Sequence, residues 1–438
     1  MTLARFMQKN KSNKSWDEFL PRATLPSWDA GSVIIAGERI VPHFQPIIGL
    51  TSGQIVGYEC LARSFSAGDS SGGSSGGSSD ISPRSFGHFF SDPKISGSFQ
   101  LEVDRALRYQ ALDYFSKHPD SGYITLNISP NWIERILETH TIPTLEMIEE
   151  TGIDPKRVVI EITETKGDLD KLKEMVDLYH QAGLMVAVDD FGAGYSQMDR
   201  IEALEPDIVK LDMRLFKQAS RGGKSADVAL SISSIANRVG CHIVCEGVET
   251  EEEFHFGIEC GSNHVQGFIF HKALADTLSA NSTVDKVRAL QKSYLKEKSI
   301  KLVRASEQKE KIKKVVLDIR ENYINGEPLK INNKIMHSDI IRYYVCDYTG
   351  NQITPHYEVS TSEFFEDYES HGMNVSHRPY FPAFIATNNS SDQIFTVSEV
   401  YRDVKSHQLC RTYAIHLDIN KILLVDALVE DEIIFAKE

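Results

Sequence analysis

Short apolar runs alternate with amphipathic stretches over residues 35–270, and this alternation constrains the fold more than any other feature of the chain. Two of the amphipathic stretches are segments 168–183 and 224–240. Each lies between two apolar runs and has the apolar spacing of a helix. Alternating strands and helices predict a parallel sheet with crossover helices, and near-continuous Val and Ile content predicts strands covered on both faces. A closed barrel and an open doubly wound sheet both fit. The runs include YITLNIS (123–129), RVVIEITE (157–164), LMVAVDD (184–190), DIVKLD (207–212), HIVCEGVE (242–249) and HVQGFIF (264–270).

The alternation is interrupted once and ends near residue 272. Residues 66–80 form a Gly/Ser tract that cannot build a packed core, and we interpret it as a flexible loop with the regularity of a designed linker. Residues 282–326 are lysine-rich and helical in pattern, and the β-rich, aromatic segment after them predicts an α+β module with an antiparallel sheet. We therefore expect a first domain over residues 1–280, a solvated linker helix over 281–326 and a smaller domain over 327–438.

Charge and cysteine content narrow the class of protein. The 438 residues correspond to roughly three domains of ~150 residues. The formal net charge of -15 argues against a protein that coats nucleic acid, so no DNA partner is expected. The six scattered cysteines include no CxxC pair and indicate reduced thiols in a cytosol. No signal-peptide core and no apolar membrane span are present in the sequence, so a soluble cytoplasmic protein is expected.

Polar side chains recur at the C-terminal ends of the apolar runs. Asp189 and Asp190 directly end one run. The carboxyl ends of parallel strands meet at one edge, where barrels and open α/β sheets bind their ligands. Each acid alone is most simply a solvated strand end or a helix cap, but their repetition favours a shared site. The other residues at comparable positions are Glu59, Asn127, Glu161, Glu164, Lys210, Glu246 and Gln266.

Carboxylates that lie close together raise one another's pKa, and a hard divalent cation relieves the repulsion. Carboxylate and amide oxygens suit Mg²⁺ or Mn²⁺. Two such ions about 3.5–4 Å apart would activate water and stabilise the leaving oxygen in phosphodiester hydrolysis. Lys210 is then either a partner in a barrel ion pair or a group that orients the metal-bound water. The glycine-rich turn after Asp190 is either a plain turn into a helix or a phosphate contact.

Eight short motifs follow one another between about residues 38 and 272. They are HFQPII (43–48), ECLAR (59–63), LNIS (126–129), EITE (161–164), DDFGAGYS (189–196), DIVKLD (207–212), CEGVE (245–249) and QGFIF (266–270). As a set, in this order, they resemble the EAL-domain family, the cyclic di-GMP phosphodiesterases of bacterial signalling. The resemblance implies a modified (β/α)₈ TIM-like barrel with one atypical strand direction. It also implies hydrolysis of cyclic di-GMP to linear pGpG with two Mg²⁺ or Mn²⁺ ions, and a homodimer.

The resemblance also implies a role for individual residues. Lys210 matches the lysine beside the nucleophilic water, and Glu164 matches the glutamate that holds the DFGAGYS loop; with Glu59 they form the implied catalytic set. Positions that contact the ligand or a site water are matched by Gln45, Arg63 and Gln266, with Arg63 suited to a phosphate oxygen. The implied metal ligands are Glu59, Asn127, Glu161, Asp189, Asp190 and Glu246.

The chain departs from the family pattern without losing an implied metal ligand. Cys60 replaces the alanine of the signature, the Gly/Ser tract follows it, HKAL (271–274) lacks a proline, and Gln197 stands where many members have serine. Degenerate receptors usually lose carboxylates or the loop glutamate. An active phosphodiesterase is therefore favoured over an EAL receptor that binds cyclic di-GMP without cleaving it. A third possible function is that of a scaffold in which the C-terminal module is the main effector.

Three C-terminal segments resemble a Cache/PAS-like sensor of the kind fused after some EAL domains: RPYF (378–381), SEVYRD (398–403) and RTYAI (411–415). Two interpretations of their side chains stay open. One is a pocket for a small ligand, and the other is a structural aromatic core or dimer face. The residues concerned are Arg378, Tyr380, Tyr401 and Asp403.

Overall fold

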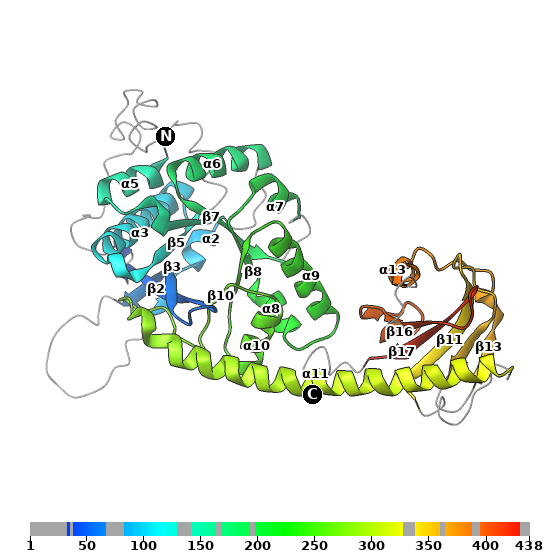
Figure 1. Ribbon diagram of the computed structural model, residues 1–438. Coiled ribbons are helices and arrows are strands. Elements are labelled where there is room, and N and C mark those ends of the chain that lie inside the picture. The colour runs from blue at the N-terminus through cyan, green and yellow to red at the C-terminus, as the bar shows by residue number, and fades with distance from the viewer. Residues whose placement is uncertain are drawn as a thin grey trace. The chain divides into compact units, whose positions relative to one another are not determined.

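The protein is described by a computed structural model that covers residues 33–35, 38–66, 83–128, 142–162, 168–192, 198–326, 338–359, 364–387 and 395–429. The chain divides into two compact units, Met1–Ser293 and Tyr294–Glu438. Figure 1 shows a unit of strands surrounded by helices, the long helix α11, and a second unit that is rich in strands. Each unit is described by itself.

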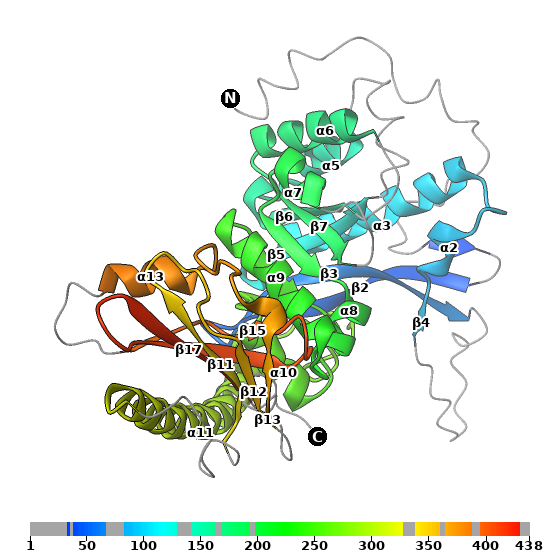
Figure 2. The ribbon, with the colours of Figure 1, turned by 90° about the vertical axis from the view of Figure 1, so that its right-hand side faces the viewer.

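The first unit contains a closed barrel of eight described strands, which confirms the predicted TIM-like fold. Strand β2 pairs with β3 on one side and with β10 on the other, and these two pairings close the sheet on itself. Both are antiparallel, whereas the remaining barrel strands run parallel, so β2 is the strand of atypical direction (Figure 2). In spatial order the strands are β2 (Glu38–Gly49), β10 (His264–Val265), β9 (His242–Cys245), β8 (Ile208–Leu211), β7 (Met185–Phe191), β6 (Val158–Ile162), β5 (Tyr123–Ile128) and β3 (Ile55–Ser66).

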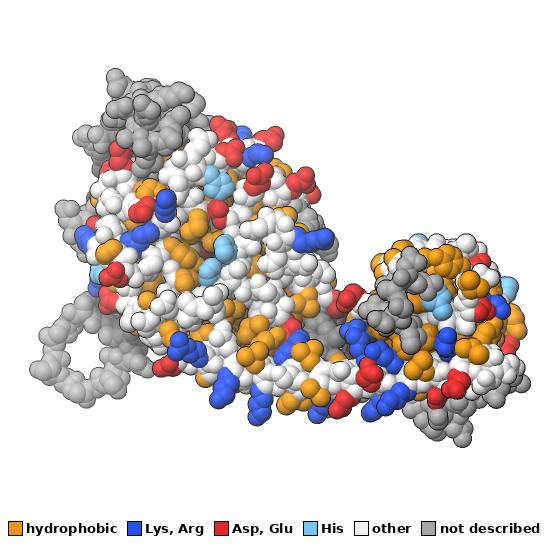
Figure 3. Space-filling view, in the orientation of Figure 1, with side chains coloured by type: hydrophobic (Ala, Val, Ile, Leu, Met, Phe, Trp, Pro, Cys, Tyr) orange, Lys and Arg blue, Asp and Glu red, His pale blue; other side chains and the backbone are white. Residues whose placement is uncertain are grey.

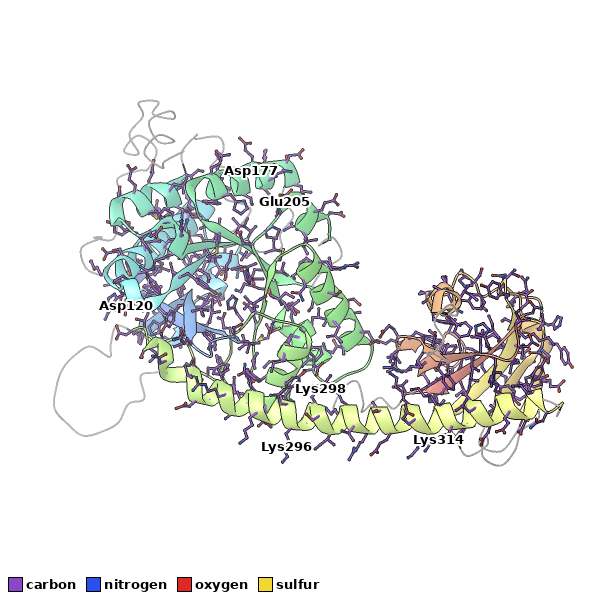
Figure 4. The ribbon with its side chains drawn as sticks, in the orientation of Figure 1. Asp120, Asp177, Glu205, Lys296, Lys298 and Lys314 are labelled. Atoms are coloured by element: carbon purple, nitrogen blue, oxygen red, sulfur yellow. The ribbon has the colours of Figure 1, made fainter. Side chains whose placement is uncertain are left out.

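Local sequence signals explain where the barrel helices begin and end. In α6 (Leu169–Ala182), the Asp168 side chain accepts hydrogen bonds from the first free backbone N–H groups, and Gly183 ends the helix at a φ of 91°. Its apolar face is buried, while Asp177 points outward (Figure 4). The other described helices of at least seven residues in this barrel are α3 (Gly97–Lys117), α5 (Pro143–Thr151), α7 (Met198–Leu204), α8 (Met213–Ala219), α9 (Lys224–Arg238) and α10 (Glu251–Glu259).

Helix α11 (Val284–Ile324) belongs to both units. Its first turns bury Val287 and Leu290 in the first unit, where Gln291 Nε2 donates to the Leu50 carbonyl at 2.7 Å. Basic side chains gather along it (Figure 3), and Lys296 and Lys314 are exposed. No helix in the described part of the chain is long and apolar enough to cross a membrane.

The second unit is an antiparallel sheet with one helix packed on each face, which confirms the predicted separate, sheet-rich module. One face packs on Ile312, Val316 and Ile319 of α11, and the other packs on Phe381 and Phe384 of α13 (Tyr380–Thr387). The strands are β11 (Ile340–Asp347), β12 (His356–Val359), β13 (Phe364–Asp367), β14 (Phe395–Val397), β15 (Tyr401–Arg402), β16 (Leu409–His416) and β17 (Lys421–Leu428).

Candidate active site

Along four neighbouring barrel strands, one inward-facing residue is apolar and the next inward-facing residue is charged. A buried apolar cluster, here called the barrel floor, is formed by Val159, Ala187, Ile208 and Val244. Side chains two residues apart on a strand point to the same face. The next inward residues after the barrel floor are therefore Glu161, Asp189, Lys210 and Glu246.

Lys210 lies at the centre of this charged layer. Its ammonium nitrogen is 2.8 Å from Glu161 Oε2, 3.4 Å from Asp189 Oδ1 and 3.7 Å from Glu59 Oε2. Glu246 Oε1 is also within ion-pair distance. Lys210 is 1% exposed and Glu161 is 0% exposed. One positive charge therefore faces four carboxylates in a place that is largely closed to water.

Two amides connect Glu59 to other strands of the barrel. Asn127 Nδ2 donates to Glu59 Oε1 at 3.2 Å, and Gln266 Nε2 donates to Glu59 Oε2 at 2.6 Å. Glu59 lies opposite the buried Gln45 in the β2–β3 register. Arg63 is four residues further along β3; burial lowers its pKa, and the Glu59 charge opposes that shift. Glu59, Gln45, Asn127 and Gln266 therefore come together at one end of the barrel interior, from β2, β3, β5 and the segment after β10.

Burial and charge repulsion shift the pKa values of this group. Burial raises the pKa of Glu161 to about 8, although Lys210 acts against it. Burial likewise raises the pKa of Glu246 well above its ordinary value. Burial alone would lower the pKa of Lys210, but the carboxylates of Asp189, Glu161 and Glu246 outweigh it and raise that pKa well above normal. The lysine is therefore always charged, and the acids carry an electrostatic cost.

The oxygens around Lys210 fit a hard divalent cation. Glu161 Oε1, Asp189 Oδ1 and Glu246 Oε1 are buried and make no hydrogen bond in the described residues, although the last two lie close to the lysine ammonium. Buried oxygens without a partner cost free energy, and a cation would satisfy them. The donor set that fits such an ion consists of Glu59, Asn127, Glu161, Asp189 and Glu246.

Asp190 is oriented differently from its neighbour Asp189. The β7–β8 register shifts between Val188 and Phe191, and Asp190 has a φ of 53°, which is uncommon for a residue with a side chain. Its side chain is exposed, yet the surrounding protein and then the charges of Asp189 and Asp212 raise its pKa. The irregularity points Asp189 into the group and leaves Asp190 at its edge.

Part of the predicted site lies outside the described residues. Glu164 and the AGYSQ part of the glycine-rich loop, Ala193 to Gln197, fall in ranges that the structure does not describe, as does the Gly/Ser tract beyond Ser66.

Tyr123 and Thr125 are polar residues of the barrel interior that the sequence reasoning missed. Both side-chain oxygens are buried without a hydrogen-bond partner in the described chain. Burial and then the Glu161 charge raise the pKa of Tyr123. Their spacing of two residues from each other and from Asn127 is the signal that would have placed them on the same inward face of β5.

Family comparisons agree with this architecture. Residues 30–273 match the EAL domain family, and residues 278–436 match the EAL-domain associated signalling protein domain. The chain therefore belongs to the EAL-domain family.

The relatives differ in how much of the chain they cover. The uncharacterized EAL-domain containing protein YkuI of Bacillus subtilis (strain 168) is 26% identical over 397 residues, which is 89% of this chain and 94% of YkuI. The YkuI crystal structure, in complex with substrate c-di-GMP and calcium, aligns with a TM-score of 0.74 over 89% of this chain and 96% of that one. The probable cyclic di-GMP phosphodiesterase PdeB of Escherichia coli (strain K12) is 30% identical over 55% of this chain, which spans only 44% of PdeB.

Proposed function

We propose that the first unit hydrolyses cyclic di-GMP to linear pGpG with two bound Mg²⁺ or Mn²⁺ ions. The observation that carries the proposal is the group of four carboxylates around Lys210, with Asn127 and Gln266 joined to Glu59. Membership of the EAL family supports it, as does the description of YkuI in complex with c-di-GMP and calcium. PdeL of Escherichia coli (strain K12), described as a cyclic di-GMP phosphodiesterase, is 26% identical over 55% of this chain.

The metal ligands in this proposal are Glu59, Asn127, Glu161, Asp189 and Glu246, and Asp190 completes the second ion's site. When bound, such ions lower the pKa of water and stabilise the leaving oxygen of a phosphodiester. Lys210 acts as a hydrogen-bond donor that orients the attacking water. In this role the lysine supplies an N–H donor to the water and does not take up its proton.

Substrate contacts follow from the same geometry. The guanidinium of Arg63 is half-buried on the strand that carries Glu59 and suits a phosphate oxygen of the dinucleotide. Gln45 and Gln266 flank Glu59 and contact the ligand or a site water. Glu164 holds the glycine-rich loop, by the family resemblance.

The decisive experiment separates an enzyme from a receptor. Purified full-length protein is incubated with cyclic di-GMP and Mg²⁺ or Mn²⁺, and pGpG is quantified by chromatography. We expect product from the wild type and a loss of about 10³-fold or more in Glu59→Ala, because both metal coordination and the amide contacts are removed. Glu251→Gln, at an exposed helix start, is the matched control and should keep its activity. Binding of cyclic di-GMP without product would establish the receptor instead.

Calcium provides a second comparison. Ca²⁺ accepts looser geometry and longer oxygen distances than Mg²⁺. We therefore expect Ca²⁺ to support binding of cyclic di-GMP but little turnover. Turnover with Ca²⁺ equal to that with Mg²⁺ would contradict the metal chemistry proposed for this site.

We also propose a cytoplasmic homodimer whose activity is tuned by a Cache/PAS-like C-terminal domain over residues 327–438, joined by the linker 281–326 to the domain 1–280. The link between the domains is supported by α11, which contributes Val287 to the first unit's core and Ile312 and Val316 to that of the second. The dimer rests on the family resemblance. Light scattering coupled to size-exclusion chromatography tests the dimer, and a monomeric mass would reject it.

A further inference from the structure

A histidine and two carboxylates meet on one face of the β12–β13 hairpin. His356 lies opposite Asp367 in the register of the two strands, and Glu358 is two residues further along β12. Directly paired residues and residues two apart on a strand share a face of the sheet. One ligand atom from each of the three lies within 4.8 Å of the others, and we call the group the hairpin cluster. Its side chains are only 13–17% exposed, so they are largely shielded from water.

The hairpin cluster already holds a positive charge. Lys405 Nζ lies 3.1 Å from Glu358 Oε1 and 3.0 Å from Asp367 Oδ2. This lysine comes from the turn after β15, and its side chain is 57% exposed. An ion pair made by an exposed lysine contributes about 1 kcal/mol or less, so a cation that binds more strongly can displace it. The ammonium therefore marks a cation position without closing it.

Each member of the hairpin cluster offers a ligand atom in the form that a metal requires. Burial lowers the pKa of His356, so its imidazole is neutral at physiological pH. The backbone N–H of Glu369 lowers the pKa of Asp367 and donates to its Oδ1 at 3.0 Å, which leaves Oδ2 for a cation. The ring of Tyr344 packs on the imidazole at 4.6 Å between centroids and restricts its orientation.

The nearest guanidinium is held mainly by other carboxylates. Arg342 Nη1 is 3.9 Å from Glu358 Oε1, but Arg342 Nη2 is 2.6 Å from Asp403 Oδ1 and Arg342 Nε is 3.1 Å from Asp426 Oδ2. The shorter contacts fix the guanidinium beside these two aspartates. Lys405 is therefore the group with which a metal ion would compete.

A cavity of about 570 Å³ lies next to the hairpin cluster. His356 lines it, whereas Glu358, Asp367 and Lys405 do not, so the cluster and the cavity are separate features. The cavity is also lined by the C-terminal residues that the sequence singled out, which are Arg378, Tyr380, Tyr401 and Asp403.

The ligand types in the hairpin cluster select among divalent cations. Mg²⁺ and Ca²⁺ prefer oxygen ligands alone, whereas one imidazole with two carboxylates suits Zn²⁺. With zinc–ligand bonds of roughly 2.0–2.2 Å, the ligand atoms of a tetrahedral site lie about 3.3 Å apart. His356 Nδ1 is 3.8 Å from Glu358 Oε1, so side-chain rotations of less than about an ångström would close this pair around an ion.

We propose that His356, Glu358 and Asp367 bind a divalent transition-metal ion of the zinc class, with water as the fourth ligand, and that the ion takes the place of the Lys405 ammonium. Because Lys405 lies on the turn between β15 and β16, metal binding releases this turn from the hairpin. The site is independent of the proposed phosphodiesterase activity, since all of its residues lie in the second unit.

The first test counts bound zinc. Metal-free full-length protein is dialysed against buffered micromolar free Zn²⁺, and zinc per chain is measured by mass spectrometry of the element. We expect the wild type to carry one ion more than His356→Gln or Asp367→Asn; the asparagine keeps an oxygen for the Glu369 N–H. Ions bound by the first unit are common to all variants and cancel. His371→Gln, at an exposed position of the same unit, is the control and should match the wild type. Equal zinc in the wild type and His356→Gln overturns the proposal.

The second test uses the competing lysine. Lys405→Ala removes an exposed side chain and should tighten zinc binding by about threefold to tenfold, because an ion pair of about 1 kcal/mol is no longer lost. The measurement is the free Zn²⁺ concentration that half-fills the additional site, with the His356→Gln curve subtracted. Lys313→Ala, which breaks a pair with Glu310 on α11, should leave this concentration unchanged. Unchanged or weaker binding in Lys405→Ala overturns the proposal.

Discussion

The ammonium of Lys210 lies 2.8 Å from Glu161 Oε2, and both side chains are almost completely buried. The two residues lie on β8 and β6, which are separated by β7, so the contact crosses the barrel interior rather than joining paired strands. Together with Asp189, Glu59 and Glu246, this pair forms a charged layer directly above the barrel floor. Such an arrangement is electrostatically strained without a further cation, and its strain can be measured.

Replacing Lys210 by methionine should destabilise the metal-free barrel. The change leaves four carboxylates without a countercharge, and loss of one partner of a buried ion pair costs about 3–5 kcal/mol. In EDTA at about pH 8, urea unfolding of Lys210→Met should show a free energy of unfolding that is lower by about 3 kcal/mol, because the acids can take up protons and reduce their repulsion. Adding Mn²⁺ should restore part of it.

The control for this variant is Lys217→Met. Lys217 pairs with Glu249 at 2.8 Å, but both side chains are considerably exposed, so the loss should be below about 1 kcal/mol. Equal stability of Lys210→Met and the wild type in EDTA would show that the charged layer is not organised by the lysine.

Gly267→Ala should disrupt the segment that carries Gln266. A Cβ at Gly267 would lie 2.0 Å from the Val248 carbonyl oxygen, a distance at which the backbone must move. We expect a loss of about 3 kcal/mol or more in urea unfolding, or failure to fold. Gly257→Ala is the comparison. Gly257 lies within α10, and its new Cβ would be an ordinary 3.5 Å from the Val265 side chain, so the higher helix propensity of alanine should make the change neutral or stabilising by up to about 1 kcal/mol. A similar loss in both variants would contradict the steric argument.

His264 should make the barrel less stable in acid. Burial, with a smaller contribution from His242, lowers its pKa from 6.5 to about 4. The unfolded state therefore binds more protons between these values, and stability decreases as pH falls from 6.5 to about 4, by at most about 3 kcal/mol.

His264→Gln removes the proton uptake of this histidine on unfolding. The difference in stability between variant and wild type should therefore change with pH between 6.5 and about 4. The difference is the useful quantity, because Glu161, whose pKa is raised to about 8, changes stability in the opposite direction. His88→Gln, at an exposed position, is the control. Parallel pH profiles for His264→Gln and the wild type, measured by calorimetry, would exclude the buried histidine as the cause.

Arg342→Met should destabilise the second unit by about 3–5 kcal/mol, because Asp403 and Asp426 would lose their shared buried partner. Lys405→Met is the comparison: this lysine side chain is 57% exposed and also pairs with two carboxylates, yet its loss should cost about 1 kcal/mol or less. Thermal unfolding of both full-length variants checks the ranking, and a larger loss in Lys405→Met would reverse the argument.

The location of the site was predictable from particular residues. The apolar runs that end in polar residues predicted a site at the carboxyl edge of a parallel sheet, and the structure brings Glu59, Asn127, Glu161, Asp189, Lys210, Glu246 and Gln266 together there. Tyr123 and Thr125 lie before the end of β5 and were missed, because the alternation that places them on the inward face with Asn127 does not by itself mark a hydroxyl as part of a site. The separate orientations of Asp189 and Asp190 were equally hidden, since the register shift in β7 depends on its pairing with β8.

The alternation of strands and helices, the change to a lysine-rich helix and the motifs of the EAL family could be seen in the sequence alone. They depend on local periods of two and 3.6 residues and on residue identities within short segments. The strand pattern alone left closure of the barrel open, and only the family resemblance implied it. Strands of an open sheet and of a barrel are buried alike, and the pairings of β2 with both β3 and β10 distinguish them. The contact of Lys210 with Glu161, 49 positions apart, likewise depends on strand order and stagger, which are set by long-range pairing.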